Sequence, residues 1–153
     1  MRFIDEAIIE ISSGDGGHGC LSFRREKFIP KGGPDGGDGG KGGDISFIAK
    51  ESLQTLQDFK LKRKYKAQNG FQGKGKNMHG KDGEDTILEV PLGTMLINDE
   101  TNELLCDLKT SNQAFTPVIG GRGGLGNARF KSSTNRAPRK TTDGFPGESL
   151  KLR

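Results

Sequence analysis

The stretch "GKNMHGKD", residues 75–82, is the part of the sequence closest to a nucleotide-binding loop. Such a loop follows the pattern G-x-x-x-x-G-K-[ST], in which backbone N–H groups and the lysine hold phosphates and the hydroxyl binds Mg²⁺. Gly75, Gly80 and Lys81 fit, but Asp82 stands in place of the hydroxyl, and its carboxylate would repel phosphate. No helix is evident after it, so a helix N-terminus that could bind the anion is also missing. We interpret the match as chance.

The other residue types that perform catalysis or bind metals do not occur at useful spacings. There is no G-x-S-x-G or G-x-G-x-x-G motif, and His18 and His79 have no cysteine or histidine at ligand spacing. Cys20 and Cys106 could pair in an oxidising compartment, but two cysteines without metal spacing favour buried free thiols in a cytoplasmic protein. We therefore expect no catalytic residue, no metal and no cofactor on this chain.

Basic and acidic residues are sorted into separate segments, as expected for a face that meets a polyanion. Residues 60–81 hold eight basic residues and no acid, residues 109–142 hold seven and no acid, and residues 82–107 hold eight acids and no base. A third basic stretch, "FRREKFIPK" at 23–31, includes aromatic rings. The absence of a recognition-helix motif favours folded RNA over duplex DNA. The alternative is a solvated surface that only keeps the protein soluble.

Short apolar runs predict the elements that position these charges, in a mainly β fold with little helix. The expected strands are "FIDEAIIEI" (3–11), "CLSF" (20–23), "DISFIA" (44–49), "DTILEVPLGTMLI" (85–97), "ELLCDL" (103–108) and "FTPVI" (115–119), with a hairpin loop at "NDETNE" (98–103). Residues 51–65 stay open between helix and strand. Leu53 and Leu56 suit a helix, whereas Thr55 and the aromatic residues do not.

Glycine, at 25 of 153 residues, is concentrated between these runs. In "KGGPDGGDGGKGGD" (31–44) and "GGRGGLGNA" (120–128) it recurs every third residue, at Gly33, Gly36, Gly39 and Gly42 and at Gly120, Gly123 and Gly126. A period of three indicates polyproline-II geometry, with glycine wherever another backbone approaches closely. The runs are too short for collagen, so we expect several segments of one chain to pack as a bundle. The alternative is a set of disordered glycine-rich loops.

The sequence resembles the N-terminal domain of the Obg family of GTPases in "SFRREKFIPKGGPDGGDGGKGGDI" (22–45), "VPLGT" (90–94) and "GGRGGLGNARFKSSTNRAPR" (120–139). The resemblance extends from Arg2 to about Gly147. It implies a small antiparallel β-barrel or sandwich base with a projecting bundle of glycine-rich polyproline-II helices. It also implies a cytoplasmic role in large ribosomal subunit assembly, with the tip of the bundle near the peptidyl-transferase RNA, and a link to stress signalling through guanosine tetraphosphate.

The resemblance assigns GTP binding to a part of the family that this sequence does not contain. In the family a GTPase domain follows, whereas no Walker A or N-K-x-D motif occurs before Arg153. GTP, Mg²⁺ and hydrolysis are therefore implied only for a full-length protein. We expect an Obg domain over residues 1–147, and in 148–153 the start of a linker to the absent GTPase domain, with "DGFPGES" (143–149) typical of a linker.

Carried onto this sequence, the resemblance places RNA-binding residues on three loops. They are Arg24, Arg25, Lys27, Phe28 and Lys31 in the first loop, Lys74, Lys76 and Lys81 in the second, and Arg129, Lys131, Arg136 and Arg139 in the third. The expected partners are the RNA of the large ribosomal subunit and the protein's own GTPase domain, for a monomer without a membrane span. The alternative function is a protein-interaction or regulatory module that docks the GTPase domain or a signalling partner without binding RNA.

Overall fold

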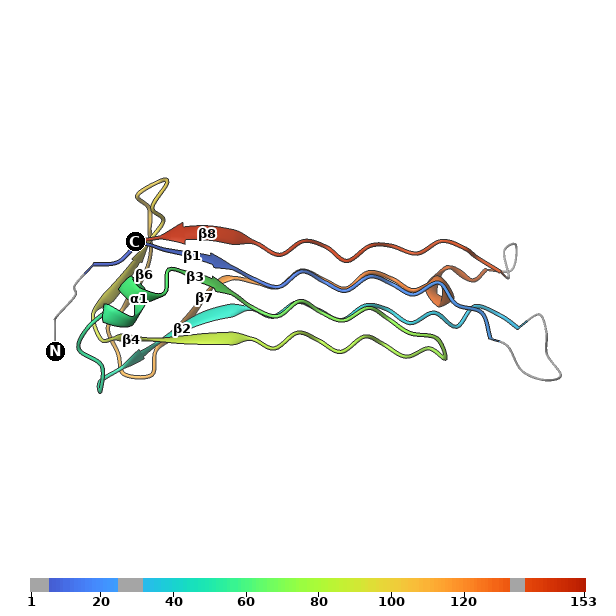
Figure 1. The fold of residues 1–153 in the computed structure, drawn as a ribbon, viewed down its shortest axis with the longest axis horizontal. Coiled ribbons are helices and arrows are strands. Elements are labelled where there is room, and N and C mark those ends of the chain that lie inside the picture. The colour runs from blue at the N-terminus through green and yellow to red at the C-terminus, as the bar shows by residue number, and fades with distance from the viewer. Residues whose placement is uncertain (1–5, 25–31, 133–136) are drawn as a thin grey trace.

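The computed structural model describes residues 6–24, 32–132 and 137–153 of the chain. They form a small β-rich base from which a long bundle of extended segments projects (Figure 1). The elements are β1 Ile9–Ser12, β2 Ile45–Lys50, α1 Gln57–Leu61, β3 Lys64–Lys66, β4 Thr86–Pro91, β5 Thr94–Ile97, β6 Leu104–Leu108, β7 Ala114–Val118, the 3₁₀ turn η1 Asn127–Phe130 and β8 Ser149–Leu152. The mainly β fold class is confirmed.

The base contains mixed sheets, whereas the resemblance implies an antiparallel barrel or sandwich. Its two three-stranded sheets have the strand orders β3-β1-β8 and β4-β2-β7, and β5 pairs with β6. The pairs β1/β3 and β2/β4 are parallel. The reason lies in the bundle: β1 and β3 both lead the chain into it, and β2 and β4 both lead the chain out of it (Figure 1). Strands that continue in the same direction pair in parallel.

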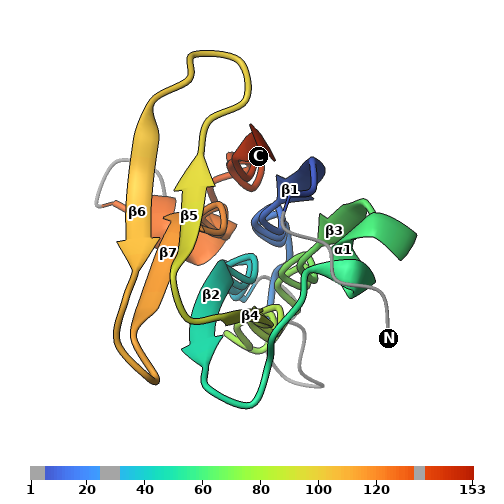
Figure 2. The same ribbon diagram turned by 90° about the vertical axis from the view of Figure 1, so that its left-hand side faces the viewer.

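A single apolar core fills the base between the sheets. Figure 2 looks onto the base and shows β5, β6 and β7 on one side and β1, β3 and α1 on the other. Phe47 on β2 is 1% exposed, and the residues buried with it come from every sheet: Ile11, Ile45, Val90, Leu96, Leu108, Val118 and Leu152. Burial of these side chains provides most of the hydrophobic stabilisation in the domain.

Several sequence predictions need correction at the level of elements. The run 85–97 divides into β4 and β5 because Gly93 turns the chain with a φ of 84°. Residues 51–65 contain α1 and the first part of β3, so the open choice resolves into both. The expected strand at 20–23 is wrong: only Phe23 forms an isolated bridge there, with Pro34. Within residues 148–153, expected to begin the linker, Ser149–Leu152 form β8 beside β1, and Leu152 is buried in the core.

The bundle consists of six segments joined by lateral backbone hydrogen bonds. The segments comprise residues 13–22, 33–44, 67–74, 79–85, 119–126 and 138–148. Their hydrogen bonds recur every third residue: between the two central segments the donors are Gly14, Gly17 and Cys20 and the acceptors are Gly43, Gly40 and Gly37, at 2.8–2.9 Å. Each central segment is bonded to four others. Gly126, with φ −73° and ψ 163°, has polyproline-II geometry. The ordered bundle expected from the glycine period is thus confirmed.

Two series of glycines in residues 36–43 let the second central segment contact two neighbours at once. A Cβ on Gly36, Gly39 or Gly42 would lie closer than 3.0 Å to a carbonyl oxygen of the first central segment. A Cβ on Gly37, Gly40 or Gly43 would meet a carbonyl oxygen of residues 78–84 in the same way. Gly120, Gly123 and Gly126 repeat this contact against the carbonyl oxygens of Gly42, Gly39 and Gly36. Neither face therefore has room for a side chain.

Candidate nucleic-acid interface

The described ends of the bundle segments that lie far from the base form the tip of the molecule (Figure 1). In the tip we include residues 20–24, 32–38, 74–79, 126–132 and 137–141. Besides Arg129, six lysines and arginines of the tip are exposed: Arg24, Lys74, Lys76, Lys131, Arg139 and Lys140. Arg129 is exposed too, but its guanidinium is engaged within the bundle. Of the described tip residues only Asp35 and Asp38 are acidic, and neither is exposed.

Asp35 holds the second tip loop against a central segment. The hairpin turn at residues 74–78 places Lys76 and Asn77 in the left-handed region, with φ values of 61° and 56°. The Lys76 N–H donates to Oδ2 of Asp35 at 3.0 Å, and the Asn77 N–H donates to the Asp35 carbonyl oxygen at 2.7 Å. Because these bonds compensate for the unusual backbone, they fix the place at which Lys74 and Lys76 are presented.

Asn127 joins three segments at the point where the glycine series ends. It is fully buried, with 0% exposure. Its Oδ1 accepts from the N–H groups of Gly36 at 2.8 Å and Ser22 at 3.3 Å, and its Nδ2 donates to the carbonyl oxygens of Ser22 at 2.9 Å and Pro138 at 3.1 Å. The side chain thus pairs with four backbone groups, of which the Ser22 carbonyl oxygen also accepts from the Asp35 N–H at 3.0 Å.

Asp38 links the third loop to the second central segment. Its Oδ1 accepts from the Gly126 N–H at 3.0 Å, and its Oδ2 lies 3.0 Å from Nε and 2.8 Å from Nη2 of Arg129. Partial burial raises the pKa of Asp38, but hydrogen bonds from Gly126 and Arg129 and the charges of Arg129 and His79 outweigh it. The pKa of Asp38 therefore lies below its ordinary value.

Two cations of the third loop lie over aromatic rings. The Arg139 guanidinium carbon lies 5.5 Å from the ring centroid of Phe23, and the Lys140 ammonium lies 5.0 Å from that of Phe130. Cation–π contact within about 6 Å is favourable, so the rings orient these side chains while leaving both residues exposed. This arrangement can bind phosphates without a large change of shape.

The structure brings together most, but not all, of the predicted RNA-binding residues that it describes. Lys74, Lys76, Lys131 and Arg139 lie at the tip, and so does Arg24, whose N–H donates to the Gly33 carbonyl oxygen at 2.8 Å. Lys81 lies one triplet nearer the base, where its carbonyl oxygen accepts from the Phe71 N–H. Arg25, Lys27, Phe28, Lys31 and Arg136 lie outside the described residues.

Three tip residues with clear roles, Asp35, Asp38 and Asn127, are missed by reasoning from charge alone. For Asn127 a signal was available: it continues the series Gly121 and Gly124 by one further step of three, without being glycine. Gly33 belongs to the glycine series by its spacing but not by its packing. A Cβ there would have only the Lys131 Nζ within 4 Å, at 3.5 Å, so the close packing expected of this glycine is absent.

Other possible sites on the described residues do not suit a nucleotide. Residues 75–82 belong to a hairpin, with no helix after them, and Asp82 Oδ1 accepts from the Lys41 N–H at 2.8 Å. They do not fit GTP or Mg²⁺, which would need a glycine-rich loop that opens a helix. Among all the residues that the structure describes, no group of three or more His, Cys, Asp and Glu residues could hold a metal ion.

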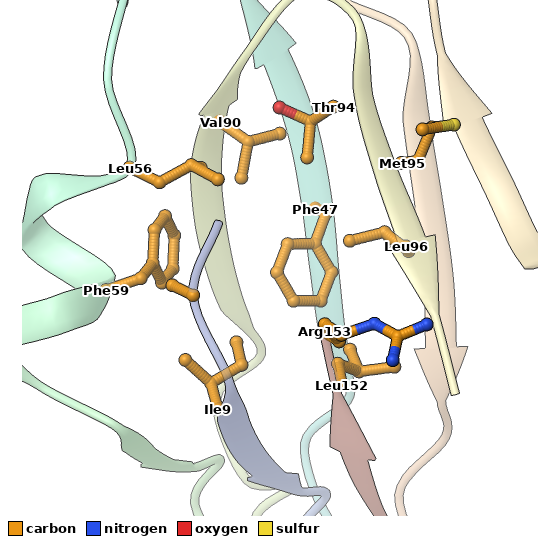
Figure 3. Close-up of a pocket in the computed structure, with 11 residues that line it drawn as sticks. Ile9, Phe47, Leu56, Phe59, Val90, Thr94, Met95, Leu96, Leu152 and Arg153 are labelled. Carbon is orange, nitrogen blue, oxygen red and sulfur yellow. The ribbon is translucent and has the colours of Figure 1, made fainter. Parts of the chain in front are cut away.

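An apolar pocket lies in the base, far from the tip. Side chains from α1 and five strands converge on it, among them Phe47, Phe59 and Leu152 (Figure 3). Its volume is about 40 Å³, whereas ligand sites usually enclose about 300–1,000 Å³. It is a gap in the core.

The basic tract 60–66 belongs to the base and not to the tip. Lys60 lies on α1 and Lys66 lies on β3.

The fold and the site define a class: a β-based domain whose glycine-rich bundle presents basic loops at its far end. The family model for GTP1/OBG matches residues 4–153. The chain is 53% identical over 148 residues to the GTPase Obg of Persephonella marina (strain DSM 14350 / EX-H1), covering 97% of this chain and 44% of that protein. It is also 53% identical over 153 residues to the GTPase Obg of Psychrobacter sp. (strain PRwf-1), covering 100% of this chain and 38% of that protein.

The chain therefore belongs to the GTP1/OBG family. It spans less than half the length of these two relatives. Within the described residues, no helix has the length and apolar character needed to cross a bilayer.

Proposed function

We propose that this chain docks, tip first, onto RNA of the large ribosomal subunit as part of an Obg-family GTPase. One observation carries the proposal: the described tip exposes seven lysine and arginine side chains, and neither of its two acids is exposed. Phosphate contacts from such residues position a protein on nucleic acid. The rigid bundle holds these cations well away from the base, so they can enter a recess in folded RNA.

The test compares two variants that change net charge equally. Lys74→Glu/Lys131→Glu reverses two exposed tip cations, and Lys60→Glu/Lys66→Glu reverses two exposed base cations. Purified large subunits are sedimented with each variant at physiological salt, and bound protein is quantified. We expect the tip variant to lose at least about tenfold in affinity, because each reversal replaces a phosphate attraction with a repulsion. Equal binding by both variants would overturn the proposal.

The activity of a full-length protein is a further part of the proposal. The two relatives are named as GTPases, and on this basis we assign GTP hydrolysis with Mg²⁺ to the part of the protein that those relatives have beyond this chain. Cytoplasmic action in assembly of the large subunit, and a link to stress signalling, belong to the same proposal. Hydrolysis of GTP by this chain alone, measured as release of phosphate, would contradict the division of roles.

A second candidate, a protein-interaction module, is favoured by exposed apolar residues on the base. Ile87, Met95 and Leu104 are 65%, 52% and 53% exposed on β4, β5 and β6, and scattered apolar residues of this kind can contribute to an interface. This candidate predicts that Met95→Lys weakens binding to the separate GTPase domain while large-subunit binding stays unchanged. It would replace the first if the chain bound that domain tightly and RNA not at all.

A further inference from the structure

Six dipeptides of the chain place aspartate or asparagine directly before glycine. They are Asp15-Gly16, Asp35-Gly36, Asp38-Gly39, Asn69-Gly70, Asp82-Gly83 and Asp143-Gly144. In such a dipeptide the glycine nitrogen can attack the side-chain carbonyl carbon of the residue before it, because glycine has no side chain to hinder the approach. The two groups must move toward each other, so a fold that holds either of them in hydrogen bonds slows the reaction.

Hydrogen bonds fix the side chain in five of the six dipeptides. A side-chain oxygen of each accepts a backbone N–H from elsewhere in the bundle at 2.8–3.0 Å: Asp15 from Gly147, Asp35 from Lys76, Asp38 from Gly126, Asn69 from Asp15 and Asp82 from Lys41. Asp143 is the exception. Its side chain is 92% exposed, and no backbone N–H of the described residues donates to it.

The glycine nitrogens of the six dipeptides differ in the same way. Five donate to an oxygen at 2.7–2.9 Å: Gly16 to that of Phe145, Gly36 to Oδ1 of Asn127, Gly39 to that of Gly124, Gly70 to that of Asp15 and Gly83 to that of Lys41. Gly144 instead donates to Nδ1 of His18 at 3.1 Å. This nitrogen accepts only while it carries no proton, and its protonated form would pair with the Asp143 carboxylate 3.5 Å away. Gly144 is therefore the least securely held.

We propose that Asp143-Gly144 is a modification site, at which aspartate converts spontaneously into isoaspartate in the folded chain. The Gly144 nitrogen bonds to the side-chain carbonyl carbon of Asp143, and one water molecule leaves, made from the carboxyl oxygen, the N–H proton and a proton of the carboxyl group. The product is a five-membered succinimide. One water molecule then opens the ring. Attack at the main-chain carbonyl gives isoaspartate, and attack at the other carbonyl restores aspartate, with no oxidation or reduction.

Isoaspartate would disturb the packing of residues 138–148, because it adds one carbon atom to the main chain just before Gly144. Gly144 packs so closely that a Cβ on it would overlap the Gly16 carbonyl oxygen. The next carbonyl oxygen, that of Phe145, accepts from the Gly16 N–H at 2.9 Å. A longer main chain cannot keep both contacts in register. Since this segment also carries Arg139, isomerisation is expected to loosen one side of the tip.

The test follows isoaspartate in the purified, folded chain during long incubation in mildly acidic buffer. Trypsin releases residues 141–151, in which Asp143 is the only aspartate, and methylation by an isoaspartyl methyltransferase with mass spectrometry quantifies each site. We expect isoaspartate at Asp143 to form at least about tenfold faster than at Asp15 or Asp82, which are exposed too and also precede glycine. A tenfold ratio corresponds to about 1.4 kcal/mol in the free energy of local opening. Equal rates at the three sites would overturn the inference.

The same measurement in concentrated urea is the control for local sequence. Without the fold, the three aspartates should react at similar rates, because each is followed by glycine. Asp82 is also the control for position, since residues 79–85 and 138–148 are both outer segments bonded to two others. An excess at Asp143 that persisted unchanged in urea would assign the reactivity to neighbouring residues, and the inference would fail.

Variants of two exposed histidines test what holds Gly144. His18→Ala removes the acceptor of the Gly144 N–H, whereas His18→Asn can supply a side-chain oxygen in its place. His79→Ala removes a histidine that lies 3.8 Å from Asp38. We expect only His18→Ala to speed isomerisation at Asp143, by about threefold or more, as the loss of one hydrogen bond allows. An unchanged rate in His18→Ala, or an equal rise in His79→Ala, would overturn the role given to His18.

Asp143→Glu tests the structural consequence. Glutamate would have to form a six-membered ring, which closes far more slowly, so this variant should gain no isoaspartate. We expect the aged wild-type chain to melt at a lower temperature than the fresh chain and aged Asp143→Glu to melt as when fresh. An isomerised wild-type chain that melted like the fresh one would contradict the packing consequence.

Discussion

At the scale of single residues, Asn127 shows how a polar side chain can take the place of backbone in this fold. Its four hydrogen bonds to Ser22, Gly36 and Pro138 are made at 0% exposure. We expect Asn127→Ala to lower the free energy of unfolding by about 3 kcal/mol or more, because several buried backbone groups lose their partners.

Thermal or urea denaturation of the purified chain measures this loss. The control is Asn69→Ala, which removes an exposed side chain with one hydrogen bond, from the Asp15 N–H at 2.8 Å, and should cost about 1 kcal/mol. Similar losses for both variants would contradict the role given to Asn127.

Asp38 makes the stability of the tip dependent on acid pH. Because folding lowers the pKa of Asp38, its charged form stabilises the native state above the pKa of the unfolded chain, about 4. This contribution is lost as the pH falls through the lower pKa of the folded state. We therefore expect the stability advantage of wild type over Asp38→Asn to be constant near neutral pH and to shrink below about pH 4. Urea denaturation of both proteins across this range measures it, and an advantage that did not change with pH would contradict the assignment.

At the scale of elements, the two glycine series predict a sharp contrast between neighbouring positions. In Gly39→Ala and Gly40→Ala the new methyl would overlap backbone carbonyl oxygens of two different segments, whereas in Gly33→Ala it would not. We expect each of the first two to cost about 4 kcal/mol or more, or to prevent folding, since backbone cannot move aside in a packed bundle. Circular dichroism melts of the three variants test this. Tolerance at Gly39 and Gly40 equal to that at Gly33 would contradict the packing.

The second central segment, residues 33–44, also contains a charged residue, Asp35, whose importance cannot be judged from the sequence alone. Asp35→Ser and Lys41→Ser look equally mild when both side chains are taken to face solvent. In the structure Asp35 is buried and bonded to the hairpin turn, while Lys41 is partly exposed and pairs with Asp44 at 2.6 Å. Asp35→Ser is therefore expected to be the more harmful of the two.

Much of the fold can be predicted from periodicity, and much of the tip cannot. The period of three at Gly36, Gly39 and Gly42 depends on close backbone contact, so it is visible in the sequence and correctly predicts the bundle. The parallel pairings β1/β3 and β2/β4 depend on which segments lie side by side, and no local pattern records this. The partners of Asp35 and Asn127 are likewise up to 105 residues away, so only the folded chain reveals them.

At the scale of the whole molecule, the separation of tip and base predicts how salt affects RNA binding. If about four tip cations contact phosphates, the logarithm of the binding constant should fall against the logarithm of salt concentration with a slope of about −3 to −4. Lys74→Glu/Lys131→Glu should reduce the magnitude of that slope by about 1.5 to 2, whereas Lys60→Glu/Lys66→Glu should leave it unchanged. Fluorescence titration at several salt concentrations measures both, and equal slopes for the two variants would contradict an interface confined to the tip.

The lateral hydrogen bonds at every third residue also restrict how the length of the domain can change in evolution. A single-residue deletion in one segment would place side chains at positions where only glycine fits. It would also move the N–H donors of that segment away from their acceptors in the neighbouring segments, which number up to four. Only whole triplets, removed from adjoining segments together, preserve the packing. Because the rise in polyproline-II geometry is about 3.1 Å per residue, adding or removing one triplet in every segment changes the length of the bundle by about 9 Å. Its reach is fixed by counting triplets, so relatives with a longer or shorter reach should differ in all six segments at once.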